Sequence, residues 1–280
     1  AKAMNACIVF AEELKSCTNV RYAPYDTLKE SRAELQELLE EEIKLQQIQE
    51  LPMKMMQFVS LINPTDAIHA IDRIIDKRKD AILIHNSSFM TGLYYELSGL
   101  CQTENCLTIL AALEILKNRG YEISKKDYHT GFSDVCEMTG LMGRWQKLQS
   151  YPDVICDTGH NADGFKCIRQ QLNYIHNKLN QELHIVFGMV NDKDISSVLE
   201  LLPKDATYYF TKASVKRALP EDELMKMASE AGLKGTSYPT VADAVRAAKE
   251  NCPPKDFIFV GGSNFIVADL LANRDTLNLY

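Results

Sequence analysis

The sequence predicts an α/β protein whose C-terminal half is a doubly wound, mostly parallel sheet. Short apolar runs alternate there with amphipathic helical patterns. The expected strands are residues 153–156, 184–187, 207–210 and 256–260. The expected helices are residues 163–179, 194–202, 221–231, 241–250 and 264–273. Strands separated by helices need crossover connections, and such connections build parallel sheets covered on both faces.

The first half of the chain is less regular, and its expected elements are shorter. A strand is expected at residues 6–10, a helix after Asp26, a second helix from Asn63, and a buried strand at residues 81–84. Further along, the patterns predict a short strand at 95–97, a helix from Glu104 to about Asn118, and a helix opened by Ser124. Caps such as Ser and Asp, and proline at the first helical position, support these helix starts.

Composition excludes several classes of function. The chain of 280 residues carries a net charge of -7, which is unsuited to binding nucleic acid phosphates. No apolar run reaches the roughly 18 residues of a membrane helix. Eight cysteines without a C-x-x-C pair indicate reduced thiols. We therefore expect a cytoplasmic protein, taken to be a monomer, without nucleic-acid or membrane partners.

Polar and glycine residues follow each expected strand of the second half. They are residues 157–161, Gly188 with residues 191–194, Thr211 and residues 261–264. Because the carboxyl ends of parallel strands share one edge, we expect these residues to converge and bind a ligand there. Glycines at 261–262 that lead into a helix allow close approach of an anion to free N–H groups. An ordinary helix cap explains the same residues equally well.

The strongest candidates stand on either side of the run 153–156. Arg144 precedes this run and Asp157 ends it, with His160 and Asn161 in the turn that follows. A permanent cation, a carboxylate and a titratable ring are thereby close in sequence. These 280 residues contain neither G-x-x-x-x-G-K-[ST] nor G-x-G-x-x-G, so a Walker phosphate loop and a dinucleotide fingerprint are both absent.

Four segments together resemble a known family. They are GLCQTEN at 99–105, GRWQ at 143–146, DTGHN at 157–161, and FGM at 187–189 with DKD at 192–194. The chain resembles the C-terminal part of folylpolyglutamate synthase/dihydrofolate synthase, in the Mur ligase superfamily, without the N-terminal phosphate loop. The likeness covers residues 93–280. It implies a partial central ATPase-type ligase domain at 1–140, divergent over 14–92, and a Rossmann-like, glutamate-binding C-terminal domain at 141–280.

The resemblance also implies a reaction and the roles of particular residues. Such ligases use ATP and Mg2+ to add L-glutamate to folate or dihydropteroate through an acyl phosphate. By resemblance, Arg144 and His160 are catalytic, and Asn105, Arg144 and Asp157 bind ATP. His160, Asn161 and Ser263 contact glutamate. The metal ligands are expected upstream, and none is expected in this chain.

One departure from the family pattern and two alternatives accompany this interpretation. Cys101 stands where the family usually has histidine. Separately, we expect the isolated chain to have little or no ligase turnover, because its phosphate binding is incomplete. The first alternative is a non-catalytic, nucleotide-binding or regulatory module of the same fold. The second is a cell-wall ligase of the Mur type. Trp145 and Gln102 favour the folate branch.

Overall fold

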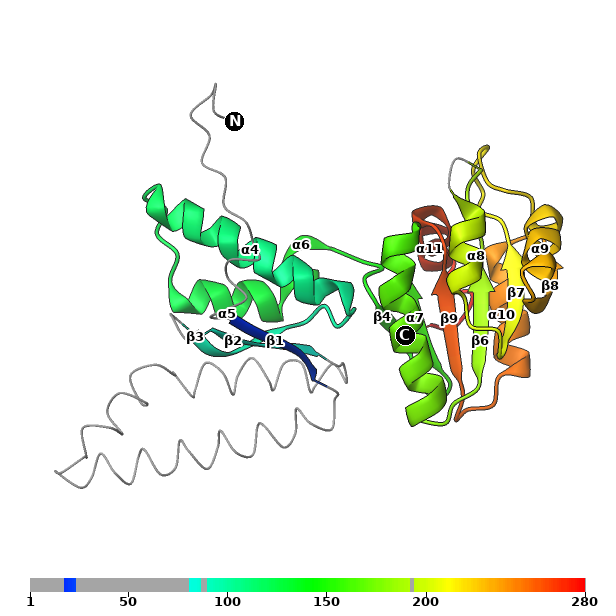
Figure 1. Cartoon of the computed structure of the whole chain (residues 1–280), viewed down its shortest axis with the longest axis horizontal. Coiled ribbons are helices and arrows are strands. Elements are labelled where there is room, and N and C mark those ends of the chain that lie inside the picture. Colours follow the sequence, from blue (N-terminus) through cyan, green and yellow to red (C-terminus); the bar gives the residue numbers. More distant parts are fainter. Residues whose placement is uncertain (1–17, 24–80, 87–89, 192–193, 280) are drawn as a thin grey trace. The chain divides into compact units, whose positions relative to one another are not determined.

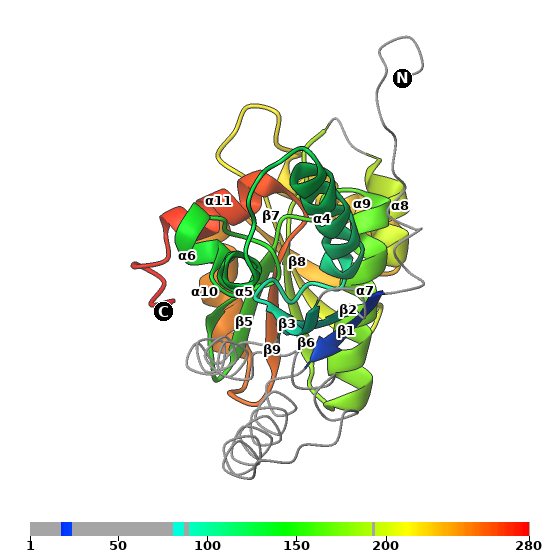
Figure 2. The same ribbon diagram turned by 90° about the vertical axis from the view of Figure 1, so that its left-hand side faces the viewer.

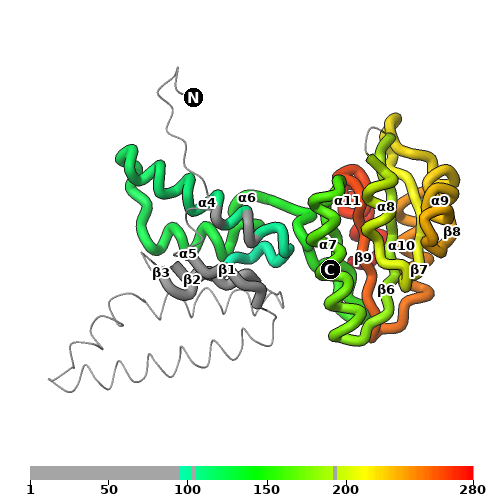
Figure 3. Tube along the Cα trace, in the orientation of Figure 1, coloured from blue at the N-terminus to red at the C-terminus, as the bar shows by residue number. Residues whose placement is uncertain are grey.

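The computed structural model describes residues 18–23, 81–86, 90–191 and 194–279. The chain divides into two compact units, Ala1–Leu141 and Met142–Tyr280 (Figure 1). The chain passes once from the first unit to the second, as the trace in Figure 3 shows. The strand expected at 6–10 and the helices expected after Asp26 and Asn63 lie outside the described residues. No helix in the described segments is long and apolar enough to cross a membrane.

The first unit contains a three-stranded antiparallel sheet and three helices. In spatial order the strands are β1 (Thr18–Ala23), β2 (Ala81–Asn86) and β3 (Met90–Tyr95). The helices are α4 (Cys101–Asn118), α5 (Lys125–Ser133) and α6 (Val135–Thr139). Helices α4 and α5 lie against this sheet (Figure 2). The strand expected at 81–84 is confirmed, and so is the helix after Ser124, whose side chain forms a capping box with Asp127.

The short strand expected at 95–97 is wrong beyond Tyr95. The N–H of Glu96 donates to the carbonyl of Phe132 at 3.0 Å instead of joining the β-ladder. The buried Glu96 carboxylate accepts the N–H of Cys136 at 2.9 Å. Both bonds tie the end of β3 to the connection between α5 and α6. The chain therefore leaves the sheet at Tyr95, and α4 begins three residues earlier than the pattern predicted.

The second unit is a six-stranded sheet with helices on both faces, which confirms the predicted doubly wound architecture. The strand order is β4-β5-β9-β6-β7-β8, and every neighbouring pair is parallel except β4 with β5. The strands are β4 (Gln146–Gln149), β5 (Asp153–Asp157), β6 (Leu183–Phe187), β7 (Ala206–Thr211), β8 (Lys234–Tyr238) and β9 (Phe257–Gly261). The helices are α7 (Ala162–Lys178), α8 (Ile195–Leu201), α9 (Glu221–Glu230), α10 (Val241–Asn251) and α11 (Asn264–Ala272).

Two separate apolar cores hold this sandwich together. Phe187, Phe210 and Phe259 pack against α7, α8 and α9 on one face of the sheet. Val186 and Val260 pack against α10 and α11 on the other face. Figure 1 shows α8 and α10 on opposite sides of the strands. Strands β6 and β9 are buried along their whole length, as expected for central strands of a parallel sheet.

Both edge strands, β4 and β8, were missing from the sequence-based expectation. Strand β4 has a single buried residue, Leu148, and β8 is exposed over its first three residues. An edge strand needs little apolar character because one side of it faces no partner, so periodicity gives it a weak signal.

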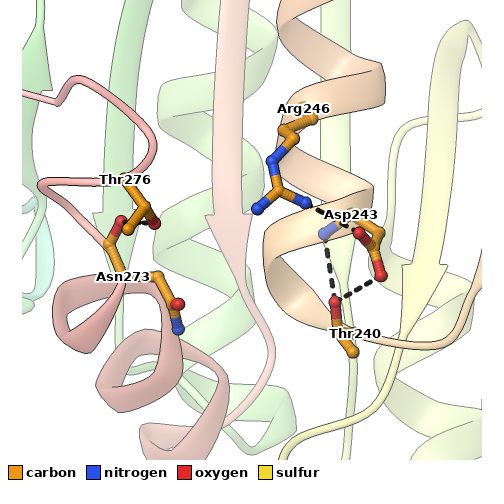
Figure 4. Close-up of polar contacts among 5 residues, drawn as sticks. All are labelled: Thr240, Asp243, Arg246, Asn273 and Thr276. Atoms are coloured by element: carbon orange, nitrogen blue, oxygen red, sulfur yellow. Dashed lines mark hydrogen bonds and ion pairs between the residues drawn. The ribbon is translucent and has the colours of Figure 1, made fainter.

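Local side-chain bonds fix the ends of the helices. Thr240 caps α10 by accepting the N–H of Asp243 at 3.1 Å, and Arg246 pairs with Asp243 at 2.8 Å one turn on (Figure 4). Beyond α11, the Thr276 hydroxyl donates to the carbonyl of Asn273 at 2.8 Å. A threonine cap of this kind stabilises a helix by about 1 kcal/mol.

A buried histidine lies near the amino ends of the strands. His184 on β6 is 8 % exposed, and its Nδ1 lies 3.0 Å from the hydroxyl of Tyr209. Burial lowers the pKa of His184, although the charges of Asp256 and Glu182 oppose this shift. The folded protein therefore favours the neutral imidazole.

The stability of the second unit should fall as the pH drops below about 6.5, the ordinary pKa of histidine. The unfolded chain takes up the His184 proton first, so stability is lost between the unfolded and the lower folded pKa. One such proton contributes a slope of at most about 1.4 kcal/mol per pH unit. Urea unfolding from pH 8 to 5 should show a shallower acid loss in His184→Gln. An unchanged slope in that variant would contradict the assignment.

Candidate functional site

The carboxylate at the end of β5 organises the candidate site. Oδ2 of Asp157 accepts the N–H of Trp145 at 2.8 Å, and Oδ1 accepts the N–H of Gly159 at 2.7 Å. One bond reaches back to the segment before β4, and the other closes the turn after β5. Asp157 thus fastens the loop before β4 to the loop after β5.

The segment 143–146 holds Arg144 beside this carboxylate. The carbonyl of Gly143 accepts the N–H of Thr158 at 2.9 Å, so both neighbours of Arg144 are bonded to the end of β5. Trp145 is 4 % exposed and its ring packs on Phe257 and Phe259 of β9. Arg144 itself is exposed. The two buried neighbours therefore fix the backbone while the guanidinium stays available to a ligand.

The electrostatics of Asp157 reflect its shielded position. Burial raises the pKa of Asp157, whereas the two N–H donors and the Arg144 charge act to lower it. The backbone bonds of Gly143 and Trp145 hold residue 144 next to the end of β5, where its charge acts on this carboxylate. Donors brought by a ligand would further stabilise the ionised carboxylate.

The turn after β5 places His160 and Asn161 next to Asp157. Nδ1 of His160 lies 3.1 Å from the carbonyl of Thr158; a carbonyl only accepts, so Nδ1 carries the hydrogen of this bond. In the neutral ring Nε2 is then an acceptor. The Asn161 side chain caps α7, with Oδ1 accepting the N–H of Gly164 at 2.8 Å.

The register of the sheet brings Ser263 to the same edge. Asp157 of β5 and Phe187 of β6 both pair with Gly261, the last residue of β9. Two residues on, Ser263 caps α11, and its Oγ accepts the N–H of Phe265 at 3.2 Å. Ser263 is 3 % exposed. Its hydroxyl hydrogen remains able to donate, so capping and ligand binding are compatible.

Two buried hydroxyls at this edge, Thr158 Oγ1 and Thr211 Oγ1, have no hydrogen-bond partner among the described residues. Leaving such a group unsatisfied costs about 1–3 kcal/mol. Each such atom calls for an explanation, and a bound water, ion or ligand is one of them.

The loop after β7 is fastened to α11. Asp269 accepts both the N–H of Ser214 at 2.6 Å and its hydroxyl at 2.8 Å. The Arg217 guanidinium lies 4.8 Å from the ring centroid of Phe265. The Arg217 carbonyl accepts the N–H of Asn191, which joins the loops after β6 and β7. The nearby residues 192–193 lie outside the described residues.

Asn105, the candidate adenine contact, belongs to α4 in the first unit. It is exposed, and its Nδ2 donates to Gln102 Oε1 at 2.9 Å. Arg144, Asp157, His160, Asn161 and Ser263 all belong to the second unit. Within the described ranges no cluster of three or more His, Cys, Asp or Glu residues could hold a metal ion.

The sequence interpretation missed part of this arrangement. Gln146 and the pair Ser214–Asp269 were not recognised as supports of the site. Trp145 was noted only as a family feature, although it anchors the segment. A tryptophan near two charged candidate residues was a usable signal. The hydrogen-bond partners of Gln146 and Asp269 could not be predicted, because they depend on tertiary structure.

The second unit is thus a doubly wound α/β domain with its candidate site at the carboxyl ends of the strands. Residues 143–264 match the family described as Mur ligase, glutamate ligase domain. This match confirms the predicted likeness to the C-terminal domain of Mur ligases over residues 143–264.

The relatives agree with this assignment. A dihydrofolate synthase/folylpolyglutamate synthase of Buchnera aphidicola subsp. Schizaphis graminum is 28% identical over 171 residues, 60% of this chain and 39% of the relative. A UDP-N-acetylmuramoyl-L-alanyl-D-glutamate–2,6-diaminopimelate ligase of Buchnera aphidicola subsp. Baizongia pistaciae is 26% identical over 224 residues, 76% of this chain and 42% of the relative.

The fold is shared with a bifunctional folylpolyglutamate synthase/dihydrofolate synthase of Yersinia pestis, solved with AMPPNP and a manganese ion. The TM-score is 0.54 at 23% identity, over 69% of this chain and 43% of that one. The chain spans less than half of the length of each of these three proteins.

Replacing Gly143 by alanine should damage the site more than a comparable change elsewhere. Gly143 has φ +73°, and an added Cβ would lie 2.8 Å from Thr158 Cγ2 and 2.9 Å from Val267 Cγ1. Gly232 has φ +82° with open space around it, so Gly232→Ala measures the backbone cost alone, about 1–2 kcal/mol. Thermal unfolding should show a larger loss for Gly143→Ala. Equal losses would show that the packing around Gly143 yields freely.

Proposed function

We propose that this chain is the glutamate-binding part of an ATP-dependent ligase that adds L-glutamate to a folate. The observation that carries the proposal is that both neighbours of Arg144 are hydrogen-bonded to the end of β5, at Asp157 and Thr158, within the region that matches the glutamate ligase domain of Mur ligases. The match to dihydrofolate synthase/folylpolyglutamate synthase supports folate or dihydropteroate as the acceptor. Mg2+ is proposed as the accompanying ion, in line with the manganese of the Yersinia structure.

The residues at this edge suit the parts of such a reaction. Arg144 would bind two phosphate oxygens through its planar guanidinium, stabilising charge during phosphoryl transfer. Asp157 would accept hydrogen bonds from the ribose hydroxyls. Asn105, which belongs to the first unit and not to this edge, is proposed as the adenine contact. His160, with Nε2 as acceptor, and the hydroxyl of Ser263 would orient the incoming glutamate, with Asn161 shaping the turn.

The metal is proposed to be held by residues other than the candidate site residues named above. The ion supplies positive charge to the phosphate oxygens when bound. We further propose that the chain acts in the cytoplasm as a monomer on small molecules, with no nucleic-acid or membrane partner. The domain assignment, 1–140 as part of a central ligase domain and 141–280 as the C-terminal domain, belongs to the same proposal.

Arg144→Ala should weaken nucleotide binding without unfolding the second unit, because the exposed side chain contributes little to the core. Loss of charge-assisted bonds worth about 1.5–3 kcal/mol corresponds to a loss of roughly 10- to 100-fold in ATP affinity. Calorimetric titration with ATP would measure it. Arg274→Ala, past the far end of α11 from Ser263, is the matched control. Equal affinity of Arg144→Ala and wild type would refute the proposed nucleotide contact.

These 280 residues, assayed with ATP, glutamate and a reduced folate, should show little or no turnover, because they contain no Walker phosphate loop. Release of inorganic phosphate measures the reaction. Melting-temperature shifts then test the substrate class, since a ligand that binds only the native state raises the melting temperature. A shift with a muropeptide precursor and none with glutamate and folate would favour a cell-wall ligase. A shift with nucleotide alone would favour a regulatory module.

A further inference from the structure

We propose that Gln146 is a positioning residue that closes the turn 143–146 with its side chain. It thereby holds Arg144 at the edge of the sheet where the carboxyl ends of the parallel strands lie. The expected effect on ligand binding rests on the proposed function, whereas the role of Gln146 in the conformation of the turn does not. Gln146 Oε1 accepts the N–H of Gly143 at 2.8 Å. The contact spans Arg144, so the arginine lies at the tip of a small turn.

The backbone around Arg144 needs such a fastening. Gly143 has φ +73° and Trp145 has φ +48°, so the residues on both sides of Arg144 adopt the left-handed region. A non-glycine residue in this region is strained and persists only where its surroundings hold it. The turn is therefore a conformation imposed by its bonds.

Three hydrogen bonds impose it, two from the end of β5 and one from within the segment. The carbonyl of Gly143 is bound by Thr158, and the N–H of Trp145 is bound by Asp157. Both come from the end of β5. The third bond, from the N–H of Gly143 to Gln146, closes the turn within the segment itself.

The position of Gln146 in a strand holds its side chain where this bond can form. Gln146 is the first residue of β4, where its backbone pairs with Cys156 of β5. The side chain therefore projects from a strand and not from a free loop, and it reaches back three residues. Because Gly143 is buried, its N–H has no easy replacement partner in solvent.

The acceptor is a neutral amide, and this has a chemical consequence. An amide oxygen binds the N–H without adding a negative charge beside Arg144. No carboxylate at residue 146 then offsets the charge of the guanidinium, which can act on Asp157 and on an anionic ligand. Gln146 supports the arginine without competing for it.

Removing the amide group should release the turn and withdraw Arg144. In Gln146→Leu, amide exchange at Gly143 should quicken about tenfold, a ratio equivalent to about 1.4 kcal/mol. The pKa of Asp157 should rise further in this variant, because the cation that lowers it has moved away. It should also rise in Arg144→Ala, which removes that cation. NMR-detected exchange and carboxyl titration measure both effects. Gln146→Glu retains an acceptor oxygen and should keep slow exchange at Gly143.

Gln149→Leu is the matched control. Gln149 lies on the same strand, but its Nε2 donates to the carbonyl of Pro152 at 3.3 Å, in the hairpin between β4 and β5. It should leave both the Gly143 exchange and the Asp157 titration unchanged. Equal effects of the two leucine variants would mean that β4 is generally loosened, and would overturn the proposal.

ADP affinity completes the test through a double-mutant cycle. Gln146→Leu should weaken ADP binding about tenfold in the wild type and not at all in Arg144→Ala, because it acts through the arginine. An equal loss in both backgrounds overturns the positioning role. Failure of the proposed function appears differently, as no effect of Arg144→Ala on ADP affinity or no ADP binding at all. Exchange and titration then decide alone: an unchanged Gly143 and Asp157 in Gln146→Leu overturn the proposal.

Discussion

The carboxylate of Asp157 accepts one N–H from the segment before β4 and one from the turn after β5, and the candidate site depends on this double acceptance. It holds the backbone on both sides of the strand with two bonds of 2.7 and 2.8 Å. The two oxygens of one carboxylate allow it to accept both N–H groups at once. The burial that raises the pKa of Asp157 makes the ionised form costly, and the two donors and Arg144 offset part of that cost. The constraint therefore fixes geometry and charge together.

The central part of the fold followed from the sequence because burial leaves a pattern in the residues. Strand β6 reads LHIVF and β9 reads FIFVG, and both are buried along their length. The edge strands β4 (QKLQ) and β8 (KGTSY) carry no such run, because one edge and part of their faces remain exposed. The end of β3 could not be predicted from Glu96 alone. Its departure from the ladder depends on Phe132 and Cys136, which are about 40 residues away along the chain.

The candidate site divides in the same way. The rule that ligands bind at the carboxyl ends of parallel strands was enough to bring Asp157, Thr211 and Ser263 to one edge. That rule says nothing about how a loop holds its side chains. The left-handed backbone of Trp145 and the bond between Ser214 and Asp269, 55 residues apart, are tertiary facts. Sequence patterns thus located the site, and long-range contacts determined its form.

Two candidate residues also cap helices at this edge, and both roles have one physical origin. The first N–H groups of a helix lack intrahelical partners, so they attract a capping oxygen or an anionic ligand. Asn161 caps α7 and Ser263 caps α11. A doubly wound domain begins every helix that follows a parallel strand at the edge where ligands bind. Capping chemistry and binding chemistry therefore select the same residue types, and a cap bond at Ser263 is no argument against a ligand there. The distinction lies in what remains unsatisfied: the hydroxyls of Thr158 and Thr211 serve no cap, yet they are buried at this same edge.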